Sequence, residues 1–131
     1  MKKFTSIILC AVFLLTLCSC GGGKPEDMSD AMYQIGLNAL ATADQYIAGE
    51  ITGDTAYDKL DEYYEQAKAQ EQSEMEELGV STLFNTKYDA DSRVSHYILI
   101  LQCDVGDAKF GSGPMSDVKE SRDNLAETLG K

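Results

Sequence analysis

The chain has 131 residues, with 22 acidic and 11 basic side chains and a formal net charge of −11 at pH 7. A chain this acidic is repelled by nucleic acid and by anionic lipid headgroups, so we exclude DNA and RNA as partners. Its length suits one domain with an ordinary hydrophobic core.

The N-terminal residues have the layout of an export signal. Lysines occupy positions 2 and 3, and residues 7–17 form an almost unbroken apolar run. A run of this length suits the core of a signal peptide, whereas a membrane-spanning helix needs about twenty residues. We therefore expect residues 1–19 to be a signal peptide that is removed on export.

A tetrapeptide ends this run, and its sequence is Leu17-Cys18-Ser19-Cys20. It resembles the lipobox of bacterial lipoproteins, although Cys18 departs from the usual Ala, Ser, Thr or Val. The resemblance implies that lipoprotein signal peptidase recognises Leu17, Cys18 and Ser19. It also implies that Cys20 carries a thioether-linked diacylglycerol, with an N-acyl chain as an optional addition. Two acyl chains give a stable anchor, so we expect a cell-membrane protein on the extracytoplasmic face.

This assignment has two alternatives. Cys18 is disfavoured as the lipidated residue because bulky Leu17 would then lie directly before it. An ordinary cleaved signal peptide with a coincidental cysteine is the other alternative. The lipoprotein assignment predicts a lipidated cysteine and flexible tether over residues 20–28 and an acidic helical domain over residues 29–131.

Removal of the signal changes the chemistry of what remains. Lys2 and Lys3 are removed with it, so nine basic and all 22 acidic residues remain and the mature charge is −13. Cys103 becomes the one free thiol, because Cys10 and Cys18 are removed and Cys20 is acylated. A disulfide framework or a cysteine metal site is therefore excluded.

Apolar residues at helical spacing predict a first helix over about residues 29–48, capped by Ser29 or Asp30. A short turn at residues 49–53 leads to a second helix that Thr52 caps and that ends near Leu78. Because the turn is short, we expect the two helices to form an antiparallel hairpin.

Residues 80–89 are predicted to form a loop whose Leu83, Phe84 and Tyr88 fold back on the core. A third helix, capped by Asp89 or Asp91, then runs to about residue 108. Residues 97–101 also suit a buried strand, but no other segment could pair with it, and unpaired backbone groups cost several kcal/mol.

Residues 110–114 form a break, and Ser116 is predicted to cap a last helix over residues 116–129. Val118, Leu125 and Leu129 of this helix are predicted to face the core. The fold is therefore predicted as all-α, a small bundle of about four helices. The mature part resembles small uncharacterised helical lipoproteins of Gram-positive anaerobes, a general likeness that implies no function.

No catalytic set emerges from the titratable residues. His96, the single histidine, lies one helical turn from Ser92, but nucleophilic catalysis also needs an orienting acid and an oxyanion site on a fixed frame. Cys103 lies two turns from His96, about 10 Å away and too far for a Cys–His pair. We interpret Cys103 as a small apolar filler.

Leu99, Ile100 and Cys103 make the third predicted helix apolar on nearly all sides. Two interpretations remain open. The helix is central and neighbours cover it all round, or these residues form an exposed strip for a partner or a dimer.

The second predicted helix has the most distinctive surface, because Asp58, Asp61, Glu62 and Glu65 are spaced along it. Like charges at this spacing destabilise an isolated helix by a few tenths of a kcal/mol each. A straight helix spreads its carboxylates, whereas calcium needs six to eight converging oxygens, so no metal site is predicted. The face, which continues through Glu71, Glu74, Glu76 and Glu77, is interpreted as solvated, with a basic envelope protein or cationic peptide as the alternative partner.

The sequence thus predicts a membrane-anchored surface lipoprotein that acts as a non-catalytic binding or scaffolding module and needs no cofactor beyond its lipid. The alternative is a protein that binds a small ligand, a cation or a cationic peptide. A cell-envelope enzyme is the third hypothesis, and it would need two acids from separate helices that face each other in a cleft.

Overall fold

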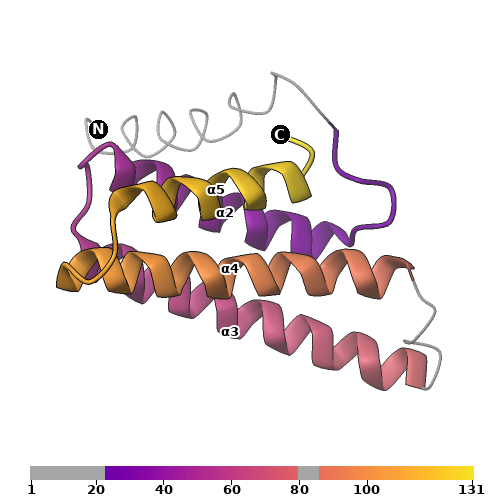
Figure 1. The fold of residues 1–131 in the computed structure, drawn as a ribbon. Coiled ribbons are helices and arrows are strands. Elements are labelled where there is room, and N and C mark those ends of the chain that lie inside the picture. Colours follow the sequence, from indigo (N-terminus) through magenta and orange to yellow (C-terminus); the bar gives the residue numbers. More distant parts are fainter. Residues whose placement is uncertain (1–22, 80–85) are drawn as a thin grey trace, which may run out of the picture.

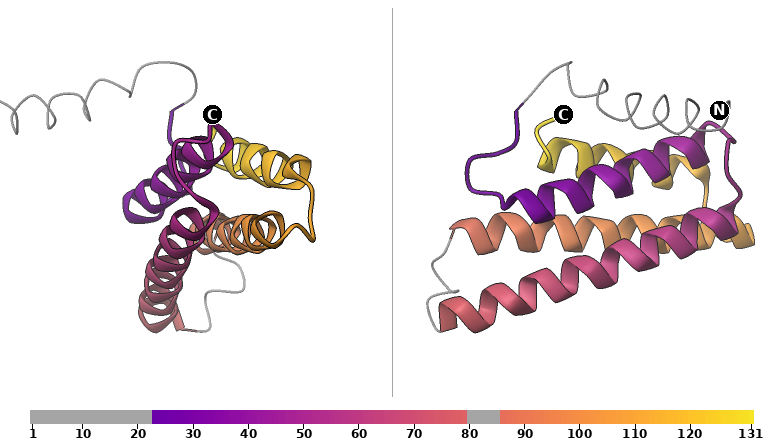
Figure 2. Two further views of the ribbon diagram at one scale, coloured as in Figure 1. Left: turned by 90° about the vertical axis from the view of Figure 1, so that its left-hand side faces the viewer. Right: turned by 180° about the vertical axis from the view of Figure 1, so that it is seen from behind.

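The computed structural model describes residues 23–79 and 86–131, which form an all-α bundle (Figure 1). Successive helices run in opposite directions, as the predicted hairpin required (Figures 1 and 2). The lipobox and the predicted core residues Leu83 and Phe84 lie outside the described residues. The helices are α2 (Asp30–Ile47), α3 (Gly53–Leu78), α4 (Thr86–Phe110) and α5 (Met115–Thr128).

Helices α3 and α4 form the most extensive contact of the bundle. Helix α2 packs against both of them, and α5 packs against α4 and α2. Helix α5 has 14 residues, whereas α4 has 25, so α5 accompanies only part of the length of α4 (Figure 1). Residues 93, 96, 103, 107 and 110 of α4 are exposed, so one long face of this helix points away from the other described helices.

The core consists of apolar side chains that recur at helical spacing in all four helices. Among the described residues, the buried hydrophobic side chains run from Met28 to Leu129 and form one cluster. Gly36 of α2 allows close packing, because a Cβ there would come within 2.6 Å of the Leu129 side chain. The largest fully buried apolar side chains are Met32, Leu60, Ile98, Leu101, Leu125 and Leu129.

Two predicted helix caps are confirmed. The hydroxyl oxygen of Ser29 accepts the backbone N–H of Met32 at 3.1 Å, and that of Thr52 accepts the N–H of Thr55 at 3.2 Å. Each cap provides a partner for a backbone donor in the first helical turn that would otherwise lack one.

The predicted starts of the last two helices are wrong. Helix α4 begins at Thr86, so Asp89 lies in its first turn and Asp91 lies inside it. Pro114, with φ −80°, is the N-cap of α5 and makes no side-chain capping bond. The Ser116 hydroxyl instead donates to Asp117 at 3.2 Å. Ser116 cannot be the N-cap because it already lies in the first turn of α5, and Pro114 fits the start of a helix because no helical hydrogen bond needs its missing N–H.

The residues just before α2 pack against the bundle. Met28 is buried, and Lys24 forms an ion pair with Asp30 at 2.7 Å while donating to the Met28 carbonyl at 2.8 Å. Residues 24–28, which the sequence assigned to the flexible tether, therefore belong to the folded domain. None of the described helices is both long and apolar enough to cross a membrane.

Candidate functional site

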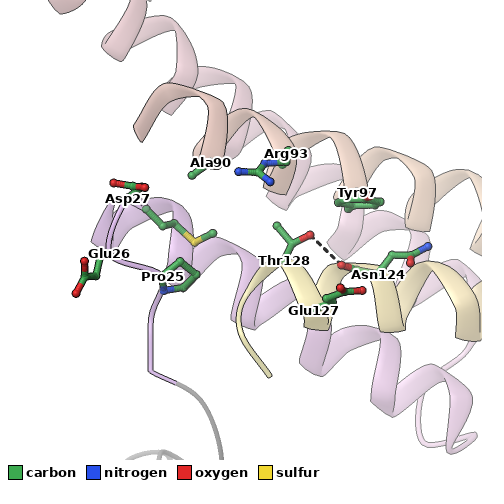
Figure 3. A pocket seen from close by; sticks show the side chains of 10 residues that line it. Pro25, Glu26, Asp27, Ala90, Arg93, Tyr97, Asn124, Glu127 and Thr128 are labelled. Atoms are coloured by element: carbon green, nitrogen blue, oxygen red, sulfur yellow. Dashed lines mark hydrogen bonds between the residues drawn. The ribbon is translucent and has the colours of Figure 1, made fainter. Parts of the chain in front are cut away.

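A polar groove lies where the N-terminal segment meets α4 and α5 (Figure 3). Its volume is about 410 Å³. Residues 25–28 form one wall, α4 forms the second and the last turns of α5 form the third. The residues that line it are Pro25, Glu26, Asp27, Met28, Ala90, Arg93, Tyr97, Asn124, Glu127 and Thr128.

The groove holds polar groups that the described residues leave largely unpaired. The Arg93 guanidinium makes one hydrogen bond to them, from Nε to the Asp89 carbonyl at 3.3 Å. The phenol oxygen of Tyr97 and the side-chain amide of Asn124 have no hydrogen bond within the described part of the chain. These groups are available to water or to a ligand.

The charges of the groove are mixed, with one guanidinium and three carboxylates. Arg93 projects from α4, and Glu127 lies across from it on α5 (Figure 3). Glu26 and Asp27 lie at the N-terminal rim. An excess of negative charge suits a ligand that carries more positive than negative groups.

A second unusual feature is a set of acids buried between α3 and α4. Glu71 and Glu74 of α3 are each 5% exposed, and Asp91 of α4 is fully buried. Glu71 accepts hydrogen bonds from the Ser95 hydroxyl and from Lys68, the latter at 2.8 Å. Paired and hydrogen-bonded in this way, Glu71 avoids much of the cost of a buried charge.

Glu74 and Asp91 face each other, and each keeps one oxygen without a partner among the described residues, Glu74 Oε2 and Asp91 Oδ2. The other oxygens are satisfied. Gln70 donates to Glu74 at 3.1 Å, and the backbone N–H of Ser29 donates to Asp91 at 2.9 Å. A proton on one carboxyl would donate to the other, which satisfies both remaining oxygens with one hydrogen bond.

Desolvation raises the pKa of Glu74 above its usual value, and a hydrogen bond to Asp91 and the charge of Asp91 raise it further. The Gln70 amide and the Lys87 ammonium act in the opposite direction. Two adjacent carboxyls in a desolvated site cannot both ionise without cost, so the pair retains a proton to higher pH than an isolated glutamate.

This acid pair does not form a catalytic cleft. Neither Glu74 nor Asp91 lines the groove, and Asp91 is inaccessible to solvent. General acid–base chemistry requires a group within hydrogen-bonding reach of the substrate. In the fold described, the pair can hold helices together but cannot touch a substrate.

The acidic residues predicted as a partner face are exposed, and they lie along α3 without converging. Asp61 accepts from Gln102 of α4 at 2.7 Å, and Glu62 accepts from Gln66 at 3.1 Å. Asp58 and Glu65 are exposed. In the described ranges, no group of three or more His, Cys, Asp and Glu residues is arranged to hold a metal ion. That these residues bind a partner stays a prediction.

The residues around His96 do not assemble into a catalytic set. His96 is exposed and contacts Tyr97 edge to face, with ring centroids 5.6 Å apart. The backbone carbonyl of Ser92 accepts from the Ser95 hydroxyl. Cys103 is exposed, and Leu99 and Ile100 are half-buried, so the interpretation of α4 as a helix covered all round is wrong.

Sequence reasoning missed the buried acids because it assigned Glu71 and Glu74 to the solvated face of α3. Their spacing could have revealed them. Residues 60, 64, 67, 71, 74 and 78 recur at intervals of three and four, so both glutamates lie within the apolar stripe. An acid at such a position signals a buried polar contact.

We compared the chain with models of known protein families, with curated protein sequences and with solved structures, and found no match. The fold and the candidate sites are therefore interpreted from their own geometry.

Proposed function

We propose that the chain is a bacterial lipoprotein, anchored through diacylglycerol on Cys20 at the extracytoplasmic face of the cell membrane. We further propose that its helical domain is a non-catalytic binding module. The observation that carries the proposal is the sequence Leu17-Cys18-Ser19-Cys20, directly after a charged and apolar export segment.

The arrangement of the described domain is compatible with such a role. The packed chain begins within a few residues of Cys20, and residues 25–28 form a wall of the groove. If Cys20 is anchored, the groove lies at the membrane-proximal part of the domain. The acidic faces of the domain are repelled by anionic headgroups, so attachment would rest on the lipid alone.

Labelling with radioactive palmitate tests the anchor. The wild-type chain should incorporate label and fractionate with membranes, and Cys20→Ser should abolish both. Cys18→Ser is the matched control, because it keeps a small residue at the same distance from the cleavage site and should remain labelled. Label that persists in Cys20→Ser would exclude the assignment.

Crosslinking on intact cells tests the binding module. A photo-crosslinker introduced at Glu127 in the groove should trap an envelope component, and one at Glu120, exposed on the same helix but outside the groove, should not. Equal trapping at both positions, or none at either, would count against a binding site in the groove.

A second candidate function is the binding of a small ligand or a cationic peptide in the groove. It is favoured by the unpaired polar groups of Arg93, Tyr97 and Asn124 beside an excess of carboxylates. Such a ligand would place its amines near Glu127 and a carboxylate near Arg93.

Thermal unfolding with added dilysine peptide measures this binding. Saturation at a hundred times the dissociation constant stabilises a protein by about 2.7 kcal/mol. Glu127→Gln should reduce the shift, whereas Glu120→Gln should retain it. No shift in the wild-type chain at millimolar peptide would reject this peptide as a ligand.

A further inference from the structure

The face of α4 that points away from the bundle carries a regular series of side chains. Five of its six residues are exposed and Ile100 is half-buried, with Phe110 exposing 78% of its surface. Leu99 borders this series and is also half-buried. We call the series the outer strip of α4, and it consists of Arg93, His96, Ile100, Cys103, Asp107 and Phe110. Arg93 lies at the edge of the strip and also lines the polar groove.

The spacing of the outer strip matches that of a helix–helix seam. One row holds residues 93, 100 and 107, and the other holds residues 96, 103 and 110, so each row repeats every seven residues. Two rows offset by three and four positions form the surface along which paired helices interlock. The described residues provide no helix to cover this seam.

The charges of the strip are ordered along the helix. Arg93 and His96 lie in its N-terminal half, one turn after the exposed Asp89. Ile100 and Cys103 lie at its centre, and Asp107 lies in its C-terminal half. An antiparallel copy of the same strip would bring Arg93 of each chain against Asp107 of the other. The apolar centres would then meet each other, and Phe110 would lie near Arg93 of the second copy.

This self-complementarity is what a two-fold interface requires, because the same surface must serve both partners. We propose that the outer strip of α4 is the interface between two copies of this chain, packed antiparallel. A parallel pair would instead place like charges opposite each other at both ends, which is unfavourable.

The net negative charge of the domain opposes association but does not prevent it. At physiological ionic strength, charges more than about 8 Å apart are largely screened, whereas the facing charges of the strip are closer than this. The same negative charge makes an anionic membrane surface a poor occupant of the strip.

Charge reversal gives the sharpest test. Arg93→Asp and Asp107→Arg each place like charges opposite each other in an antiparallel pair. We expect each change to weaken self-association by roughly tenfold or more. An equimolar mixture of the two variants should associate again, because both facing pairs then join opposite charges. Sedimentation equilibrium of residues 20–131, with Cys20→Ser to exclude lipid, measures these constants.

The matched controls are Lys119→Asp and Glu120→Arg, which make the same charge changes at exposed positions of α5. They should leave the association constant within about twofold of wild type, since they lie outside the strip. Circular dichroism checks that every variant is folded. The proposal is overturned if the wild type is monomeric at 200 µM, or if the mixture associates no better than either variant alone.

The full-length protein on intact cells provides an independent test through Cys103. Packed helices lie 8–10 Å apart, so the two thiols near the centre of the strip would be within reach of a short bismaleimide. Wild type should give a crosslinked dimer and Cys103→Ser should not. Cys103→Ser combined with Glu50→Cys, an exposed turn residue, is the control and should remain monomeric. A crosslink from Cys103 only to a different protein would also overturn the proposal.

Discussion

Both long faces of α4 mix polar with apolar residues. The face toward α3 buries Asp91, Ser95 and Gln102, whereas the outer strip exposes Cys103 and Phe110 to solvent. Buried polar groups are tolerated where each finds a partner, as Ser95 finds Glu71. The comparison teaches that hydropathy alone does not identify the inner face of this helix, because hydrogen-bonding partners on α3 decide it.

The largest expected effect is the difference in stability loss between alanine substitutions at two isoleucines of α4. Ile98 is fully buried, so Ile98→Ala should lower the free energy of unfolding by roughly 2–5 kcal/mol, through lost burial and a cavity. Ile100, half-buried on the outer strip, should lose about 1 kcal/mol or less when changed to alanine. Urea unfolding of the dilute protein measures both values. Equal losses would mean that the outer strip is part of the core.

The pH dependence of stability should identify the acid pair. The pKa of Glu74 is raised in the folded state, so the fold binds a proton that the unfolded chain has already lost. The stability that this proton contributes is therefore complete below the pKa that Glu74 has in the unfolded chain. It is lost as the pH rises through the higher pKa that Glu74 has in the folded state. The slope contributed by one proton is at most about 1.4 kcal/mol per pH unit.

Urea unfolding from pH 4.5 to 8 of the wild type and two variants measures this slope. Glu74→Gln should flatten the stability curve over that range. Glu76→Gln removes an exposed acid from the same helix, and it should keep the wild-type curve apart from a small change in net charge. Parallel curves for the two variants would contradict a shared proton in the pair.

Two serines of α4 provide a comparison of intermediate size. Ser95 is buried and donates to Glu71, so Ser95→Ala should cost roughly 1–3 kcal/mol by leaving a buried carboxylate oxygen without its donor. Ser92 is half-buried, and Ser92→Ala should change stability by about 0.5 kcal/mol or less. Thermal unfolding measures the difference, and a smaller loss for Ser95 than for Ser92 would show that its hydrogen bond contributes little.

The smallest effect is expected at the exposed end of the outer strip. Phe110→Ser should change the unfolding free energy of the dilute monomer by about 0.5 kcal/mol or less, because the ring is mostly exposed. The substitution removes the contact between the phenyl ring and the Lys109 ammonium, which lies 4.8 Å from the ring centroid. A loss above 2 kcal/mol in calorimetry would show that Phe110 supports the fold.

Much of the fold could be predicted from the sequence, because local signals and tertiary packing agree in three of the helices. Ser29 and Thr52 cap where they were expected to, and Val118, Leu125 and Leu129 are buried as predicted. Agreement between propensity, capping and apolar spacing makes such helices predictable.

Helix α4 and the acids opposite it were less predictable, since their positions depend on partners that are distant in sequence. Asp91 was predicted to cap its own helix, but it accepts from the backbone of Ser29, 62 residues earlier. Glu74 was expected in solvent because charged residues are seldom buried without a partner. The partner lies on another helix, so inspection of α3 alone could not reveal it. The groove could not be predicted for the same reason, because it forms only where residues 25–28, α4 and α5 meet.

The bond from Ser29 to Asp91 has a mechanical consequence if Cys20 is anchored. A pull on the lipid would reach Lys24, Met28 and Ser29 before it reached the body of α2. Because Ser29 is held by a buried residue of α4, the load would pass sideways into the centre of the bundle rather than unwinding the first helix from its end. The domain would therefore resist traction at its tether by extracting Met28 and breaking a buried hydrogen bond together, a cooperative step rather than gradual fraying.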